Sequence, residues 1–511
     1  MTWPVWAVLL GTAPVVLLAT LVLRDRPLLA SARTAVGVAA VLALLAYGLD
    51  ATALGVAVLR GTWTGVWILA IVLPALLLFE VLDRSGALQH LSLATDRLAP
   101  TDGRALLLLA FALPSFLQGA AGFGAPIAMS APLLVRRGMA PVAAVAACLI
   151  GYQWSVTFGS MGSSYFMAEA TARLSEADAR EFALRAGVVL GLNAILSGLL
   201  VLTRGRRSRG DTWRALVIGS AMALTLVVVV SAQPALGSTA AGLVGLAVCW
   251  LVLPGRGRPR PAGGDLLAAA LPYAVLTVTA TIAFALPPVR ALLDRVPELA
   301  PVLPGADAAF GFSTPESAVT PVFRPLLHPL PYVLLAVAVG LVVYRRRGWW
   351  PAGSTHESLR HWSRRARSVG PPIVWLAVLA AIMADAGMIA AVAQFLSTVL
   401  GLGFLAVSAP LGTLGTVLTG STTASNALFS SLQAEVAAVL GISATILLSG
   451  QTAGGNIGNA LSPAVIAVGT TAAGASRREG EVLRRNLGGA GILMLAVIAS
   501  VVAQAWLARG G

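Results

Sequence analysis

Long apolar segments alternate with short, arginine-rich loops along almost the whole chain. A helix needs about 20 apolar residues to cross the hydrocarbon core of a bilayer. Short loops rich in basic residues mark the cytoplasmic side of a membrane protein. When every such loop is placed on one side, the segments amount to about 12 transmembrane helices. The pattern therefore predicts an all-α polytopic protein, embedded in the lipid bilayer of the cytoplasmic membrane.

Residues 105–135 form an apolar segment that is interrupted at its centre, where residues 117–126 read LQGAAGFGAP. Glycine lowers helix stability and proline removes a hydrogen-bond donor. In lipid, such a broken backbone persists only where it is buried in protein or lines a cavity. Arginines flank both ends of the segment, which places both ends in the cytoplasm. We therefore expect a re-entrant hairpin with the glycines at its tip.

A second interrupted segment, residues 403–440, lies in the other half of the chain. Thr419 follows Gln118 by 301 positions, and the two residues precede corresponding tips. Glu435 is the one charged residue in this segment, as expected if both of its ends face outside. The two halves would then be inverted repeats, which are typical of secondary transporters. The alternative is chance similarity between two apolar runs that contain glycine.

Two more interrupted segments, 140–168 and 442–473, follow the hairpins. Glycine and small polar residues are concentrated at four places within them, namely 151–155, 159–164, 451–456 and 459–463. We expect discontinuous helices that break at these places. The structural alternative is that small residues occur here because two helices cross closely, which produces the same composition.

The predicted organisation has five parts. Residues 1–61 form N-terminal transmembrane helices, 62–185 the first repeat, 186–344 central transmembrane helices, 345–370 a basic cytoplasmic loop, and 371–511 the second repeat. Each repeat contains one hairpin and one broken helix. A proline-rich external region, 289–325, separates two of the central spans, and the sequence assigns no role to it.

Composition excludes several classes of protein. With 57% hydrophobic and 11% charged residues, the chain lacks the composition of a soluble domain. The net charge is +14, but the arginines cluster in short loops between apolar segments, which argues against nucleic acid as a partner. The four histidines lie outside the spans or at their edges, which disfavours an intramembrane hydrolase. No phosphate-binding loop is present, and we expect no enzymatic activity, no metal and no cofactor.

Helices that end inside a membrane expose free backbone N–H groups at their N-termini, and such ends bind anions. The side chains at the interruptions are polar but almost uncharged. They suit a small carboxylate with a hydroxyl group, bound through amides and hydroxyls. The candidate substrate-binding residues lie at these interruptions: Gln118, Gly119, Gly122, Phe123, Gly124, Tyr152, Gln153, Ser421, Thr422, Thr423, Ser425, Asn426, Gln451, Thr452, Gly454, Gly455 and Asn456.

The same interruptions carry a resemblance to a known family. Residues 119–126 read GAAGFGAP, 158–162 FGSMG and 420–429 GSTTASNALF, and the pairs 454–455 and 462–463 read GG and SP. With these strings the chain resembles the bacterial L-lactate permeases, which take up 2-hydroxy-monocarboxylates such as L-lactate and glycolate. The resemblance implies a secondary transporter with paired re-entrant hairpins. The resemblance also implies membership of a larger group of transporters that are often dimeric and elevator-like. A homodimer is therefore one option for the assembly.

Three positions depart from the family pattern. Where this chain has Gln118, Thr422 and Asn459, the family pattern has a glutamate, an aspartate and, nearby, a lysine. A proton carrier needs a titratable group, and glutamine, threonine and asparagine do not titrate. The resemblance therefore implies ion-gradient-coupled symport but leaves the coupling ion open between H⁺ and Na⁺.

Two other functions compete with monocarboxylate symport. The first is transport of another organic anion, and the second is cation antiport by the same fold group. An antiporter needs an acidic residue at the centre of the spans, and the interruptions lack one. Asp385, near the end of a predicted span, is the strongest candidate among the acidic residues, since ionisable groups inside membranes tend to be functional.

Overall fold

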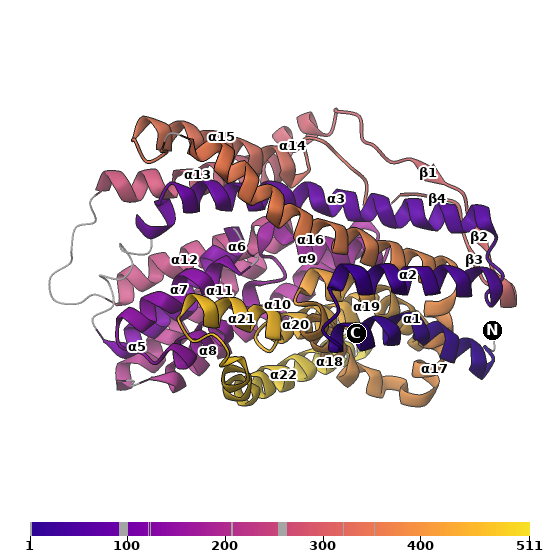
Figure 1. The fold of residues 1–511 in the computed structure, drawn as a ribbon. Helices are drawn as coiled ribbons and strands as arrows, with labels where there is room; N and C mark the ends of the chain where they lie inside the picture. Colours follow the sequence, from indigo (N-terminus) through magenta and orange to yellow (C-terminus); the bar gives the residue numbers. More distant parts are fainter. Residues whose placement is uncertain are drawn as a thin grey trace.

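The computed structural model describes residues 3–90, 101–120, 122, 124–205, 208–253, 263–319, 321–351 and 353–510. In these residues nearly all regular structure is helical (Figure 1). Of the described helices, 11 are long and apolar enough to cross a membrane, or up to 12 if the bent pair Pro141–Ser155 and Ser160–Thr171 counts as one span. The structure therefore confirms the prediction of an all-α polytopic membrane protein.

The helices of the first half are α1 (Val5–Leu23), α2 (Leu28–Leu45), α3 (Ala51–Arg84), α5 (Asp102–Ala105), α6 (Leu113–Ala120), α7 (Ala125–Arg136), α8 (Pro141–Tyr152), α9 (Ser163–Thr171), α10 (Glu176–Val201), α11 (Arg209–Ala232) and α12 (Gly237–Val252). The helices of the second half are α13 (Gly263–Ala285), α14 (Pro287–Leu293), α15 (Pro329–Arg346), α16 (Ser354–Asp385), α17 (Met388–Leu400), α18 (Phe404–Thr419), α19 (Thr422–Leu440), α20 (Ala444–Asn459), α21 (Pro463–Ala472) and α22 (Glu479–Gly510). A π-helix occupies Leu106–Ala112, and 3-10 turns occupy Gln153–Ser155, Ser160–Gly162, Leu202–Arg204, Pro234–Leu236, Ala309–Gly311 and Gly401–Gly403.

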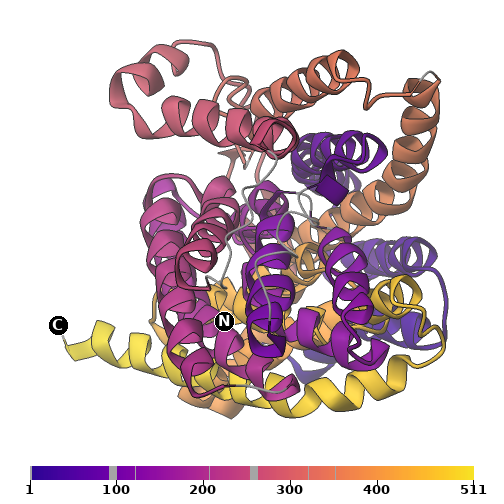
Figure 2. The ribbon, with the colours of Figure 1, turned by 90° about the vertical axis from the view of Figure 1, so that its left-hand side faces the viewer.

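Two long helices, α3 and α16, pack side by side (Figure 1). Their contact is close because glycines of α3 face the backbone of α16. A Cβ atom at Gly61 would lie 2.4 Å from the Cα atom of Val378, and one at Gly65 would lie 2.7 Å from the Cα atom of Val374. Small residues allow helix backbones to approach in this way. We call α3 and α16 the framework helices. On the far side of the bundle from α13 and α15, α22 runs along the edge (Figure 2).

Short turns join α6 to α7 and α18 to α19, and the two helices of each pair pack against each other. Gly124 precedes α7 with a φ of 83°, and Gly420 ends α18 with a φ of 74°. Glycine adopts such positive φ values without the steric cost that other residues incur. The chain therefore turns where the hairpin tips were predicted. The insertion of these pairs as re-entrant hairpins, and the inverted repeat, remain predictions.

The two predicted broken helices differ. Between α8 and α9 the chain leaves the helical conformation, and the two helical segments are bent by 42° relative to each other. By contrast, α20 runs without interruption through 451–456, so the break predicted there is wrong. Its glycines serve a close crossing, because a Cβ atom at Gly454 would lie 1.9 Å from the carbonyl oxygen of Ala409 in α18. The break after α20 falls at residues 460–462.

Two other segments are more regular than the charge pattern predicted. Residues 345–370 were assigned to a loop, yet α16 begins at Ser354 and covers most of this segment. Arginine is a good helix former, so a basic segment can be helical outside the membrane. The region 289–325 contains two short antiparallel sheets, in which β1 (Val302–Leu303) pairs with β4 (Ser317–Ala318) and β2 (Ala306–Asp307) with β3 (Ser313–Thr314).

Candidate functional site

A cavity of about 630 Å³ lies where the two helix turns approach each other. We call it the central cavity. Its wall includes residues of α2, α6, α8, α9, α16, α18, α19, α20 and α21 as well as residues of both turns. Its described lining residues are Pro27, Leu28, Leu29, Gln118, Gly124, Tyr152, Val156, Ser160, Ser163, Ser164, Arg367, Ser368, Val369, Pro372, Ile373, Thr419, Gly420, Ser421, Thr422, Thr423, Ala424, Asn459, Ala464, Val465 and Val468.

Residues from both predicted tips line this cavity. Gln118 and Gly124 belong to the first turn, whereas residues 421–423 belong to the second, about 300 positions further along the chain. Tyr152, at the end of α8, also lines it. Phe123 lies outside the described residues. The geometry thus brings the two turns to one space, and the binding roles of these residues stay predictions.

Four helices begin at the wall of the central cavity. Gly124 precedes α7, Ser163 is the first residue of α9, Thr422 is the first residue of α19, and Ala464 is the second residue of α21. The first turn of a helix carries unpaired N–H groups and the positive end of the helix dipole. Four such ends around one space favour a negatively charged ligand.

Hydroxyl groups and one guanidinium group complete the lining. Ser163 and Ser164 add hydroxyls beside Thr423, to which Ser164 is hydrogen-bonded at 2.9 Å. Among the described residues that line the cavity, Arg367 is the one with a formal charge. These serines lie in the interruption at 159–164 but are not among the predicted substrate-binding residues. No feature of the sequence singled out Arg367, because its segment was assigned to a loop.

Three polar candidates, Asn426, Thr452 and Asn456, lie behind the wall in a chain of buried hydrogen bonds. Asn426 Nδ2 donates to the backbone oxygen of Ser164 at 2.8 Å and to Thr452 Oγ1 at 3.0 Å. Thr452 Oγ1 lies 2.9 Å from Thr157 Oγ1, which donates to Asn456 Oδ1 at 2.9 Å. Because Asn456 Oδ1 can only accept, Thr157 donates to it and Thr452 donates to Thr157. The chain of bonds joins the α8–α9 break to α19 and α20.

Other candidates from the second half pack within that half. Gln433 Nε2 donates to Gln451 Oε1 at 3.0 Å, and Gln451 Nε2 donates to Ser425 Oγ at 3.2 Å. Ser425 Oγ donates in turn to the backbone oxygen of Gly412 at 2.8 Å. The carbonyl oxygen of Gly455 accepts from Thr422 Oγ1 at 3.1 Å, which ties α20 to the start of α19.

Three candidates from the first half make close structural contacts. A Cβ atom at Gly119 would lie 2.4 Å from the backbone nitrogen of Thr239, and one at Gly122 would lie 1.7 Å from Ser160 Oγ. Gln153 Nε2 donates to Ser197 Oγ at 3.2 Å. These residues shape the wall from behind, and none of them is among the described lining residues.

Comparison with known proteins points to one family. The sequence model described as L-lactate permease matches residues 7–508. The L-lactate permease of Escherichia coli (strain K12) is 27% identical over 490 residues, which cover 88% of this chain and 86% of the relative. The glycolate permease GlcA of the same strain is 29% identical over 479 residues, covering 84% and 83%. The L-lactate permease of Bacillus subtilis (strain 168) is 26% identical over 514 residues, covering 90% and 89%.

Among solved structures, the YdaH transporter of Alcanivorax borkumensis matches with a TM-score of 0.50 and 17% sequence identity, covering 88% of this chain and 87% of that chain. At this identity the match shows a likeness of fold only. The sequence relatives are bacterial permeases rather than enzymes, and 11 or more candidate spans make the chain a multi-pass protein of the cell membrane. Because the family match extends over nearly the whole chain, this protein belongs to the L-lactate permease family.

Proposed function

We propose that this protein is a secondary active transporter that carries a small monocarboxylate, such as L-lactate or glycolate, by ion-gradient-coupled symport. The observation that carries the proposal is the set of four helix N-termini around the central cavity. Their N–H groups and dipoles suit one carboxylate, and the serine and threonine hydroxyls suit the 2-hydroxyl group. The names of the family relatives agree with this substrate class.

The coupling ion is either H⁺ or Na⁺. Among the described residues that line the central cavity there is no aspartate, glutamate or histidine. His328, just before α15, is buried, and burial lowers its pKa to about 4, so it stays neutral at physiological pH. A carbonyl and hydroxyl site for Na⁺, or a titratable group away from the cavity, would provide the coupling.

Uptake into proteoliposomes tests the proposal. Radiolabelled lactate, glycolate and a dicarboxylate are offered under an imposed H⁺ gradient, an imposed Na⁺ gradient, or neither. We expect accumulation of a monocarboxylate under one of the two gradients. Accumulation of another organic anion, such as the dicarboxylate, in place of a monocarboxylate would refute the proposed substrate class. Cation exchange without anion uptake would favour the antiporter.

A charge placed in the cavity tests the site. Ser421 precedes α19 and lines the cavity, whereas Ser443 precedes α20 and is not among the described lining residues. Aspartate is a good residue at both positions, because it caps helix N-termini. At about 6 Å, with an effective dielectric constant of about 20, two carboxylates repel by about 3 kcal/mol. We expect Ser421→Asp to raise KM by about tenfold or more and Ser443→Asp to leave it nearly unchanged. An equal change of KM in the two variants would show that the central cavity is not the substrate site.

The protein purified for the uptake assay also serves to determine the oligomeric state. The resemblance makes a homodimer one option, and mass measurement of the purified protein in detergent distinguishes a dimer from a monomer. The transport proposal makes no use of a second chain, so it stands with either result.

A further inference from the structure

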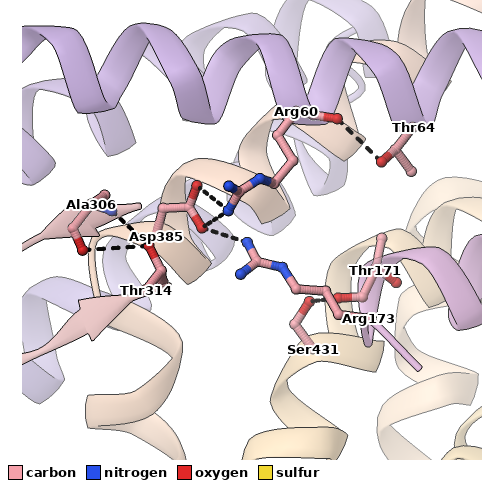
Figure 3. Close-up of polar contacts among 8 residues, drawn as sticks. All are labelled: Arg60, Thr64, Thr171, Arg173, Ala306, Thr314, Asp385 and Ser431. Atoms are coloured by element: carbon pink, nitrogen blue, oxygen red, sulfur yellow. Dashed lines mark hydrogen bonds and ion pairs between the residues drawn. The ribbon is translucent and has the colours of Figure 1, made fainter. Parts of the chain in front are cut away.

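The turn between α9 and α10, residues 172–175, is held at both ends by ion pairs to segments distant in sequence. Arg173 Nη2 contacts Asp385 Oδ1, at the end of α16 (Figure 3). Glu176, the first residue of α10, pairs with Arg324 at 2.9 Å, a few residues before α15. The turn thus presents a positive group to one neighbour and a negative group to another.

Asp385 has a second partner that comes from the framework itself. Arg60 of α3 donates through Nη1 to both carboxylate oxygens of Asp385, each at 3.0 Å (Figure 3). The side chains of Arg60 and Asp385 are 6% and 1% exposed, whereas that of Arg173 is 34% exposed. The Arg60–Asp385 pair joins the framework helices α3 and α16 to each other. If Arg173 moves away, the buried carboxylate of Asp385 still has Arg60 as its ion-pair partner.

The turn is attached to the wall of the central cavity. It follows directly after α9, whose first residues line the cavity. At the other end of α9, Ser431 Oγ donates to the backbone oxygen of Thr171 at 2.7 Å, and near its start Asn426 Nδ2 donates to the backbone oxygen of Ser164 at 2.8 Å. These bonds fix α9 to α19, which also lines the cavity. A displacement of α9 and α19 along the framework helices would therefore carry the turn with it and separate both ion pairs.

Two details indicate an interface that can separate. Beside the cluster is a hollow of about 20 Å³, which Arg60 and Arg173 line. Arg60 Nη2 has no hydrogen-bond partner there among the described residues. Arg60 and Arg173 are like charges that share Asp385, and the hollow leaves them incompletely packed, so both features lower the cost of moving Arg173 away from Asp385.

The cavity and the turn lie toward different sides of the protein. The cavity wall includes residues 27–29 and 367–369, which adjoin arginine-rich segments that the charge pattern places in the cytoplasm. The α9–α10 turn lies in a segment that the same pattern places outside. On that pattern the central cavity adjoins the cytoplasmic side and the α9–α10 turn lies on the external side.

We propose that Arg173 and Glu176 form a two-ended latch on the external side, which holds the cavity-bearing helices α9 and α19 against the framework helix α16 and against the segment before α15. Both ion pairs open when the cavity turns toward the outside. This inference rests on the proposed function, because it requires a cavity that faces the two sides in turn. Arg173 and Glu176 are positioning residues, which affect access to the cavity without contacting the substrate.

Thiol labelling of the cavity from outside tests the latch. A background without Cys148 and Cys249, both buried, carries Ser421→Cys as the reporter in the cavity wall. The labelling rate with a membrane-impermeant maleimide is measured in right-side-out vesicles without substrate. We expect Arg173→Gln and Glu176→Gln each to raise the rate by about three- to tenfold, the range that loss of a partly exposed ion pair allows. The double variant should exceed both.

Two further variants provide controls. Glu181→Gln removes an ion pair that is internal to α10, with Arg185 at 2.6 Å, and should leave the rate unchanged. Arg173→Lys retains the charge and should stay within about twofold of the parent. Glu176 is 62% exposed, so Glu176→Gln gives a folded test even if Arg173→Gln assembles poorly. The latch is refuted if the bridging variants label at the parent rate, or if Glu181→Gln labels as fast as they do.

The labelling assay needs no substrate, so its outcome is separate from that of the transport assay. Absence of monocarboxylate uptake with a raised labelling rate would leave the latch in place and refute the substrate class. Monocarboxylate uptake with an unchanged labelling rate would refute the latch alone.

Discussion

Gly454→Ala is expected to destabilise the protein because α18 and α20 cross in direct backbone contact. The added Cβ atom would lie 1.9 Å from the carbonyl oxygen of Ala409, whereas ordinary contacts are 3.4–4 Å. The two helices would therefore have to separate by about 1.5 Å, at an overpacking cost of about 1–3 kcal/mol. The crossing is reciprocal, since a Cβ atom at Gly412 would lie 1.9 Å from the carbonyl oxygen of Gln451. The contact thus leaves little room for local relaxation.

Thermal unfolding of the purified protein in detergent measures this effect, with Gly37→Ala as the matched control. Gly37 lies in α2 and is exposed, and no atom lies within 4 Å of its added Cβ atom. Alanine there should be neutral or stabilising by up to about 1 kcal/mol, from helix propensity. We expect the unfolding midpoint to fall by about 1–3 °C in Gly454→Ala and not in Gly37→Ala.

Substrate uptake by the same two variants separates packing from binding. If Gly454 acts through packing, uptake falls in proportion to the loss of folded protein and KM stays constant. A variant with the parent's unfolding midpoint and a raised KM would refute the packing argument and place Gly454 in the substrate site.

Three further predictions follow from the described geometry. Gln118→Glu places a titratable carboxyl on the cavity wall, so uptake should become more dependent on pH between 5.5 and 8.5; profiles that differ only in height would contradict a coupling role. Glu435→Cys should react with an impermeant thiol reagent from outside and Arg137→Cys should not, whereas the opposite pattern would overturn the inverted topology. Thr157→Val should destabilise the protein by about 1–3 kcal/mol, because it breaks the buried chain of hydrogen bonds. Thr398→Val, at an exposed site, should be close to neutral in the same unfolding assay.

The interruptions in the apolar pattern located the turns correctly. Gly124 and Gly420 lie at turns because positive φ favours glycine, and this preference is local enough to act through sequence alone. The break expected at 451–456 was wrong for a reason that sequence cannot resolve. A segment whose glycines end a helix and a segment whose glycines allow a neighbouring backbone to approach have the same composition. Only the position of α18 distinguishes the two cases here.

The cavity was harder to predict than the turns. Gln118, Tyr152 and the 421–423 stretch could be nominated because they flank interruptions, and the structure places them on the wall. Arg367 could not be nominated, because its place at the wall depends on a helix that the charge pattern did not indicate. The pairing of Asn426 with Ser164 joins residues that are 262 positions apart, and no local pattern specifies such a partner.

The buried chain of hydrogen bonds has a consequence for how the protein is made. Thr157 and Thr452 are 295 residues apart, so a ribosome that adds 5–20 residues per second needs about 15–60 s to supply the second partner after the first. During that interval the polar groups at the α8–α9 break are in the membrane without the partners that later satisfy them, at a cost of a few kcal/mol for each unpaired group. A chain that stops before α20 lacks the groups that close the first break, and the central cavity is complete only after α21, which also lines it, has been synthesised. Assembly of the cavity is in this sense a late step of biosynthesis.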